Sequence, residues 1–127
     1  MHVLLIEPDK ILSNIYVRSL VGAGHTVAAT MNAQHAIQLA DEQQPDLVIV
    51  ELQLKGHNGV EFLYEFRSYQ EWLTIPVLVH SFVPPTEFVR TPLLTQELGV
   101  NDYLYKPTTS LAKLIQAVQK LVPIKAL

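Results

Sequence analysis

Carboxylates, a hydroxyl and an ammonium group follow four apolar runs of the sequence, each at the point where the run ends. Glu7 and Asp9 follow "HVLLI", Glu51 follows "LVIV", Ser81 follows "VLVH", and Lys106 follows "DYLY". Carboxylate oxygens are the ligands that hard cations such as Mg²⁺ prefer, and an ammonium binds phosphoryl and carboxylate oxygens. Ligands bind outside the carboxyl ends of the strands in an open parallel sheet, so we expect these groups to meet at one edge.

The elements that must position these groups alternate along the chain. Five apolar runs are predicted as strands: His2–Glu7, His25–Thr30, Asp46–Glu51, Ile75–His80 and Asp102–Lys106. The first, third and fourth are almost continuous in Val, Ile and Leu, which is typical of strands buried on both faces of a parallel sheet. The alternation predicts one doubly wound α/β domain.

Helix-length segments with a polar capping residue separate the runs. We expect helices from Asp9 to about Gly22, Asn32 to Gln43, Asn58 to Tyr69, Pro92 to Leu98 with Thr91 as N-cap, and Thr109 or Ser110 to Leu121. A loop with one turn near Glu87–Arg90 is expected before Pro92, because Pro84 and Pro85 cannot lie inside a helix. The domain is predicted to span 1–121, with 122–127 as a short tail.

Composition excludes several classes of function. The chain has 127 residues, a formal net charge of −3 and no cysteine, which excludes disulfides, thiolate metal sites and a cysteine nucleophile. Lys and Arg are scattered along the sequence, so we expect no nucleic-acid partner. No apolar run is long enough to span a membrane, and we expect a cytoplasmic location.

The segments "VLLIEPD", "DLVIVELQLKGHNGVEFL", "IPVLVHS" and "LGVNDYLYKPT" together resemble the receiver domain of two-component response regulators (CheY-like), over essentially the whole chain. The resemblance implies a flavodoxin-like sheet of five parallel strands, order 2-1-3-4-5, with helices on both faces. In that family an aspartate after the third strand accepts a phosphoryl group from a histidine kinase, and an acidic pair after the first strand binds Mg²⁺. A Ser or Thr and a Lys contact the phosphoryl oxygens, and an aromatic residue before that Lys rotates inward on activation.

The family's site residues match this chain only in part. Ser81, Lys106 and the aromatic Tyr103 match their positions, whereas Glu51 stands where the phosphoacceptor aspartate is expected. Glu7 matches the first acid, Pro8 replaces the second, and Asp9 lies one residue further on, where we expect it to cap a helix. We therefore predict no catalytic residue, no cofactor, and at most weak Mg²⁺ binding at Glu7 and Glu51.

We interpret the chain as an atypical single-domain response regulator, a pseudo-receiver that is not an enzyme, is not phosphorylated and acts through protein contacts. The expected contact surface, as the resemblance implies, consists of Pro92–Leu98, Asp102–Tyr105 and Thr109–Leu121, and a second copy of the chain is one candidate partner. Glu51 can reach Lys106 and Ser81, which would either hold an active-like arrangement or leave an inert one.

Two other interpretations remain open. The chain could be a working Mg²⁺-dependent phosphoacceptor in which Asp9 replaces the lost acid and Glu51 is phosphorylated. It could also be a scaffold or dimerisation module without a switch. His80 is expected at the loop edge near the site, and no spacing of histidines supports zinc.

Overall fold

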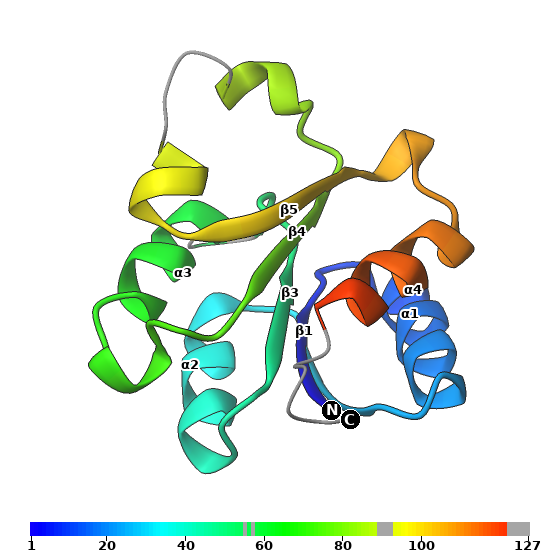
Figure 1. Cartoon of the computed structure of the whole chain (residues 1–127), viewed down its shortest axis with the longest axis horizontal. Coiled ribbons are helices and arrows are strands. Elements are labelled where there is room, and N and C mark those ends of the chain that lie inside the picture. Colours follow the sequence, from blue (N-terminus) through cyan, green and yellow to red (C-terminus); the bar gives the residue numbers. More distant parts are fainter. Residues whose placement is uncertain (55, 57, 89–92, 122–127) are drawn as a thin grey trace.

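Five parallel strands form one sheet in the order β2-β1-β3-β4-β5 (Figure 1). They are β1 (His2–Ile6), β2 (Thr26–Thr30), β3 (Leu47–Val50), β4 (Val77–Ser81) and β5 (Val100–Tyr105). The computed structural model, which describes residues 1–54, 56, 58–88 and 93–121, confirms the predicted fold class and strand order. The predicted tail, 122–127, lies outside the described residues.

Helices cover both faces of the sheet (Figure 1). The helices α1 (Lys10–Gly22) and α4 (Leu111–Lys120) lie on one face, and α2 (Ala33–Glu42) and α3 (Gly59–Phe66) lie on the other. Short turns complete the chain: Gln70–Trp72, Pro85–Phe88 and Lys106–Thr108 are 3₁₀ turns, and Leu93–Glu97 is a π turn.

The core is divided by the sheet into two clusters. Along β1, Val3 and Leu5 pack on the side of α1 and α4, while Leu4 and Ile6 pack on the side of α2 and α3. All four residues of β3 are buried. This alternation within an apolar run explains why the sequence is nearly continuous in Val, Ile and Leu, since both faces of the sheet are covered.

The predicted helix caps Asp9 and Ser110 are confirmed. The side chains of Asp9, Asn32, Asn58 and Ser110 each accept a hydrogen bond from the backbone N–H three residues further on. Each cap pairs one of the N–H groups that a helix start leaves without an internal partner.

Two predicted helices differ from the structure. The helix expected to reach Tyr69 ends at Phe66, since the Ser68 hydroxyl bonds to the Glu65 carbonyl and Trp72 stacks on Phe66 with ring centroids 5.0 Å apart. A hydroxyl that bonds back to the helix competes with the next turn. The helix expected over Pro92–Leu98 is only the π turn Leu93–Glu97, and both Thr91 and Pro92 lie outside the described residues.

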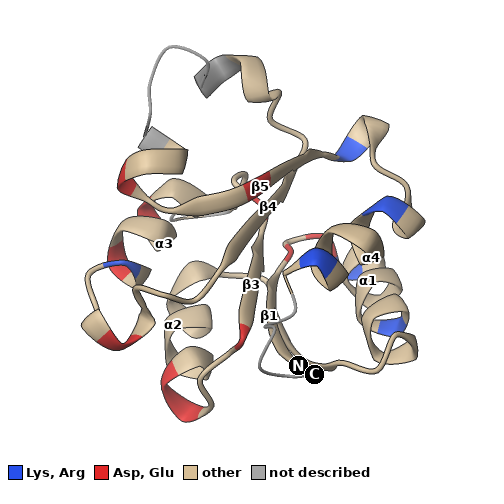
Figure 2. Cartoon of the chain, in the orientation of Figure 1, with Lys and Arg blue, Asp and Glu red and all other residues tan. Residues whose placement is uncertain are grey.

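The α-helices on the two faces of the sheet differ in their charged residues (Figure 2). The helices α1 and α4 carry Lys10, Arg18, Lys113 and Lys120 and no acidic residue. The helices α2 and α3 carry Asp41, Glu42, Glu61 and Glu65 and no Lys or Arg. Four of the nine basic residues thus lie on α1 and α4, while Arg67 lies at the end of α3 on the other side of the sheet. Among the described residues, no helix is long and apolar enough to cross a membrane.

Candidate functional site

Lys106 lies between two buried carboxylates at the carboxyl edge of the sheet. Its Nζ donates to Glu7 Oε1 at 2.5 Å and to Glu51 Oε1 at 2.9 Å. The three side chains are 4% exposed or less. We call Lys106, Glu7 and Glu51 the Lys106 network.

Every carboxylate oxygen of this network accepts a hydrogen bond. Glu7 Oε2 accepts from the backbone N–H of Asp9 at 3.0 Å, and Glu51 Oε2 accepts from that of Gln53 at 3.1 Å. Glu51 Oε1, already bonded to Lys106, also accepts from the N–H of Phe82 at 3.1 Å. The Lys106 ammonium lies 4.7 Å from the centroid of the Phe82 ring, where a cation is attracted by the ring face.

Strand pairing places these groups. Glu51 directly follows β3, and its N–H bonds to Ile6 O at 3.0 Å, which extends the ladder with β1 up to the residue before Glu7. Lys106 follows β5 and begins the turn Lys106–Thr108, where the Thr109 hydroxyl bonds to Tyr105 O at 2.7 Å. The carboxyl ends of parallel strands lie at the same edge of the sheet, so residues far apart in sequence meet there.

Ser81 completes the surroundings of Glu51. Ser81 is fully buried at the end of β4, and its Oγ accepts from the Val83 N–H at 3.0 Å. Burial alone would raise the pKa of Glu51, but hydrogen bonds from Ser81 and Lys106, and the charge of Lys106, outweigh it and lower this pKa below its usual value. Glu51 is therefore a carboxylate at neutral pH.

Tyr103 is turned toward the loop that follows β4. Its ring is half-buried and packs against the core cluster on the side of α2 and α3. Its hydroxyl donates to Val83 O at 2.6 Å, within the segment that also bonds to Ser81.

The three residues of the predicted degenerate acidic pocket, Glu7, Pro8 and Asp9, differ in their surroundings at the end of β1. Pro8 is half-buried, and Asp9 is exposed and uses Oδ1 to accept from the Leu12 N–H at 3.0 Å. Among the residues that the structure describes, no group of three or more His, Cys, Asp or Glu side chains could hold a metal ion.

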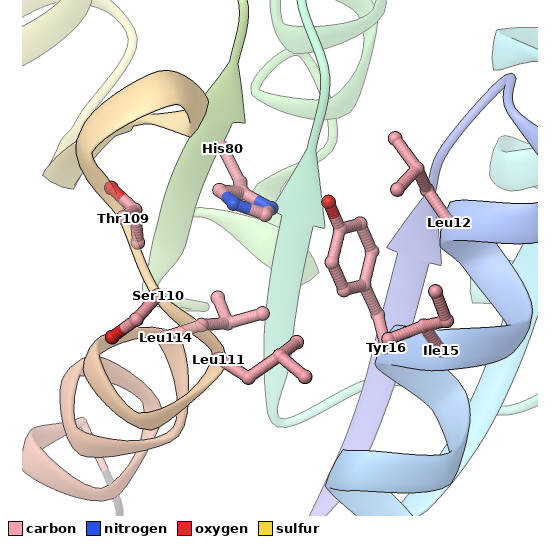
Figure 3. Close-up of a pocket in the computed structure, with 8 residues that line it drawn as sticks. All are labelled: Leu12, Ile15, Tyr16, His80, Thr109, Ser110, Leu111 and Leu114. Carbon is pink, nitrogen blue, oxygen red and sulfur yellow. The ribbon is translucent and has the colours of Figure 1, made fainter.

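The prediction for His80 is wrong in its location. His80 lies within β4, is 4% exposed, and meets Tyr16 of α1 edge-on, with ring centroids 4.9 Å apart. Both rings face a pocket between α1 and α4 (Figure 3). Burial and the charge of Lys106 lower the pKa of His80 to about 4, so its imidazole is neutral at physiological pH.

Three features of the site were not foreseen from the sequence: the pairing of Glu7 with Lys106, the contact of Phe82, and the approach of Tyr16 to His80. The sequence placed Tyr16 only on an apolar helix face, a role it shares with Leu12 and Leu20. The one indication was its aromatic ring on an otherwise aliphatic stripe, because aromatic rings favour edge-on contacts with one another.

The sequence matches the family model described as "Response regulator receiver domain" over residues 3–119. It is 32% identical over 122 residues to the probable C4-dicarboxylate response regulator DctR of Bacillus subtilis (strain 168), covering 93% of this chain and 50% of that protein. It is 28% identical over 106 residues to the KDP operon transcriptional regulatory protein KdpE of Escherichia coli (strain K12), covering 84% and 44%. The chain thus spans half or less of the length of these curated relatives.

Among solved structures, the chemotaxis response regulator CheY4 of Vibrio cholerae superposes with a TM-score of 0.83 at 19% identity, covering 95% of this chain and 98% of that one. At this identity the likeness supports the fold alone, whereas the family model covers nearly the whole chain. The chain belongs to the family of response regulator receiver domains, the receiving modules of two-component signalling.

Proposed function

We propose that this receiver is a pseudo-receiver, which keeps an active-like arrangement without phosphorylation and signals through protein contacts. The observation that carries the proposal is the Lys106 network, in which one buried ammonium bridges Glu7 and Glu51 and every carboxylate oxygen is already hydrogen-bonded.

Glu51 takes the place of a phosphorylated aspartate in this proposal. Its side chain is one methylene longer than Asp, and its carboxylate accepts from Ser81 and Lys106. These are the donors that the family resemblance assigns to the phosphoryl oxygens. A permanent negative charge at this point would hold the loops after β4 and β5 as a phosphoryl group does.

The donor set does not suit Mg²⁺. A hard cation needs several carboxylate oxygens directed at it, whereas Glu7 Oε1 and Glu51 Oε1 both bond to the Lys106 ammonium, whose positive charge repels a second cation. Pro8 supplies no carboxylate, and Asp9 is used as a helix cap. Lys106 supplies the positive charge that the two carboxylates require, so the network is balanced by its own side chains.

Tyr103 favours the active-like arrangement over the inert one. The resemblance associates activation with an aromatic side chain that has turned inward, and Tyr103 is half-buried with its hydroxyl bonded to Val83 O at 2.6 Å. Val83 also donates to Ser81, which in turn is bonded to Glu51. A continuous chain of contacts thus leads from Glu51 to Tyr103.

The partner in this proposal is another protein, with a second copy of this chain as one candidate. It would bind the surface formed by Pro92–Leu98, Asp102–Tyr105 and Thr109–Leu121. Pro92 lies outside the described residues, while β5 and α4 present the rest of this surface beside Tyr103 and Lys106.

The test is uptake of phosphate from acetyl phosphate with Mg²⁺, measured by intact mass. We expect no adduct on the natural chain, on Glu51→Asp or on Pro8→Asp. The double variant Pro8→Asp/Glu51→Asp should gain a phosphoryl group, because the nucleophile and the metal ligand are restored together and act through one metal. Pro8→Asp combined with Glu65→Asp, an exposed change on α3, is the matched control and should stay unmodified.

A phosphoryl adduct on Glu51 of the natural chain would overturn the proposal in favour of a working phosphoacceptor. The active-like part is tested separately, by aromatic NMR of the unphosphorylated double variant. There the Tyr103 ring should lose its contacts with Val83 and regain them on phosphorylation. Unchanged contacts would show that Glu51 does not hold Tyr103 in place.

A further inference from the structure

A pocket of about 250 Å³ opens between α1 and α4, and no side chain of the Lys106 network lines it. Half of its lining residues are aliphatic: Leu12 and Ile15 come from α1, and Leu111 and Leu114 come from α4. Thr109 and Ser110 line it directly before α4, and the two polar rings of Tyr16 and His80 form its inner end (Figure 3). Ile15 and Leu111 are 39% and 42% exposed and Ser110 is exposed as well, so the rim of the opening is mainly apolar.

The two polar rings are buried without hydrogen-bond partners. His80 is 4% exposed and Tyr16 is 7% exposed. Within the described part of the chain, neither the imidazole nitrogens nor the phenol oxygen has a hydrogen bond to protein, yet none of them is closed off from solvent, since His25 Nε2 is the one enclosed side-chain atom there without a partner. Two polar groups that face the same pocket and have no protein partner are free to bond to a molecule that enters it.

The surroundings define the charge of that ligand. Burial and the nearby Glu7, Asp9 and Glu51 carboxylates raise the pKa of Tyr16 to about 12, so the phenol keeps its proton and donates. Burial and Lys106 lower the pKa of His80, which stays neutral with one donor and one acceptor nitrogen. A charged ligand would lose its hydration without gaining an opposite charge among these groups.

The size of the pocket defines the shape of the ligand. A cavity of about 150 Å³ lined by aliphatic side chains binds benzene, and this pocket has about 250 Å³. A fused bicyclic ring therefore suits the volume. Its flat faces would contact the leucines, and its polar atom would reach the inner end.

We propose that the pocket between α1 and α4 is a binding site for a small, uncharged, planar molecule that hydrogen-bonds to Tyr16 and His80. This goes beyond the proposed function, because it assigns a small-molecule input to a domain whose output is a protein contact. The helix α4 lines the pocket and also belongs to the proposed contact surface.

Indole is the probe, and the methyl resonances of the full chain are followed by NMR during its titration. We expect saturable shifts at Leu12, Leu111 and Leu114, with a dissociation constant on the order of 1 mM or below. His80→Phe removes the acceptor for the indole N–H and should weaken indole binding roughly 3- to 10-fold, the range for loss of one hydrogen bond. Tyr16→Phe should weaken by the same factor the binding of 7-azaindole, a second probe whose added ring nitrogen can accept from the Tyr16 phenol. Tyr64→Phe, at an exposed tyrosine of α3, should leave the affinity unchanged. Naphthalene, which lacks the N–H, should bind more weakly than indole.

Filling the pocket gives an independent check. Ile15 is partly exposed, so Ile15→Trp can place its ring over the leucines and should abolish the indole shifts, while Val21→Trp on the exposed part of the same helix should not. Thermal unfolding verifies that each variant is folded. If His80→Phe fails to fold, the binding measured with Tyr16→Phe and Ile15→Trp still tests the proposal. The absence of saturation, or equal binding of indole and naphthalene, would overturn the proposal. A third outcome is that the natural chain does not bind indole but self-associates, and that Ile15→Trp abolishes this self-association. That outcome would overturn the proposal and assign the pocket to a second copy of the chain.

Discussion

At the scale of single residues, the charge of Lys106 decides whether two buried carboxylates can coexist. Glu7 and Glu51 both bond to its ammonium, and the side chains of all three are 4% exposed or less. Burying charges costs several kcal/mol for each ion, and the attraction to a well-bonded opposite charge offsets this desolvation cost. The network thus adds little net stability while it fixes the positions of three loops, and loss of its cation has a large cost.

We expect Lys106→Met to destabilise the fold by about 3–5 kcal/mol, the usual cost of leaving buried charge unpaired. Urea unfolding at neutral pH measures the change. The matched control is the triple variant Glu7→Gln/Glu51→Gln/Lys106→Met, which removes all three charges and should recover most of the lost stability. If Lys106→Met costs no more than an exposed pair, under about 1 kcal/mol, the network is open to solvent in solution.

At the scale of elements, the start of α3 is packed against the end of β3. Gly59, the first residue of α3, donates its N–H to Leu52 O at 2.9 Å. A Cβ at this position would lie 2.6 Å from Glu51 O and 2.7 Å from Leu52 Cα, both backbone atoms. The absence of a side chain at Gly59 therefore lets the helix approach the strand end that carries Glu51.

Gly59→Ala should destabilise the domain by about 1–3 kcal/mol, because the backbone must move to admit the methyl group. Gly22→Ala is the matched control, since a Cβ at Gly22 has nothing within 4 Å. That change should be neutral or stabilise the domain by up to about 1 kcal/mol through helix propensity. Both are measured by urea unfolding. Equal effects of the two substitutions would contradict the close approach of α3 to β3.

The strands and the helix caps could be predicted from the sequence because each depends on a local pattern, whereas the strand order was implied by the family resemblance. Asp9, Asn58 and Ser110 cap helices with side chains only a few bonds from the N–H they accept from. The end of α3 and the π turn Leu93–Glu97 depend on distant contacts, such as the Arg67 guanidinium bonded to Leu98 O at 2.9 Å. No periodicity encodes those contacts.

The meeting of the candidate site residues at one edge could be predicted from their positions after the strands, but their pairing could not. Strand order brings Glu7, Glu51, Ser81 and Lys106 to one edge. Which carboxylate Lys106 bonds to depends on rotamers and on the backbone N–H groups of Asp9, Gln53 and Phe82. The sequence suggested a pair of Glu51 and Lys106, whereas the structure has a bridge of three charges.

At the scale of the whole molecule, the sheet separates a basic face on α1 and α4 from an acidic face on α2 and α3. A separation of charge across a domain orients an approaching partner within about a Debye length, roughly 8–10 Å at physiological salt. An acidic partner surface would meet α4 first. The proposed contact surface includes this helix, so electrostatic attraction and the Lys106 network act on the same side of the protein.

Stability as a whole should depend on pH through His80 and Glu51. The pKa of His80 falls from 6.5 to about 4 on folding. As pH falls below 6.5, His80 is protonated in the unfolded chain but stays neutral in the folded chain until about pH 4. The free energy of unfolding therefore decreases as pH falls from 6.5 to about 4. The pKa of Glu51 is also lowered on folding, from 4.5. The contribution of Glu51 to the free energy of unfolding is present above pH 4.5 and is lost as pH falls through its pKa in the folded chain.

His80→Phe keeps a ring against Tyr16 and removes the titrating group, so it should flatten the stability profile between pH 6.5 and pH 4. The fall in pKa from 6.5 to about 4 corresponds to about 3 kcal/mol that the natural chain loses over this window and the variant keeps. Urea unfolding at several pH values gives the profile.

His35→Gln, at an exposed histidine of α2, is the control and should retain the natural slope. The pKa of His25 is lowered in the same direction, so a residual slope in His80→Phe is expected. Parallel profiles for His80→Phe and the natural chain would show that the imidazole is protonated equally in the folded and unfolded states, and that the pocket beside it is open to water.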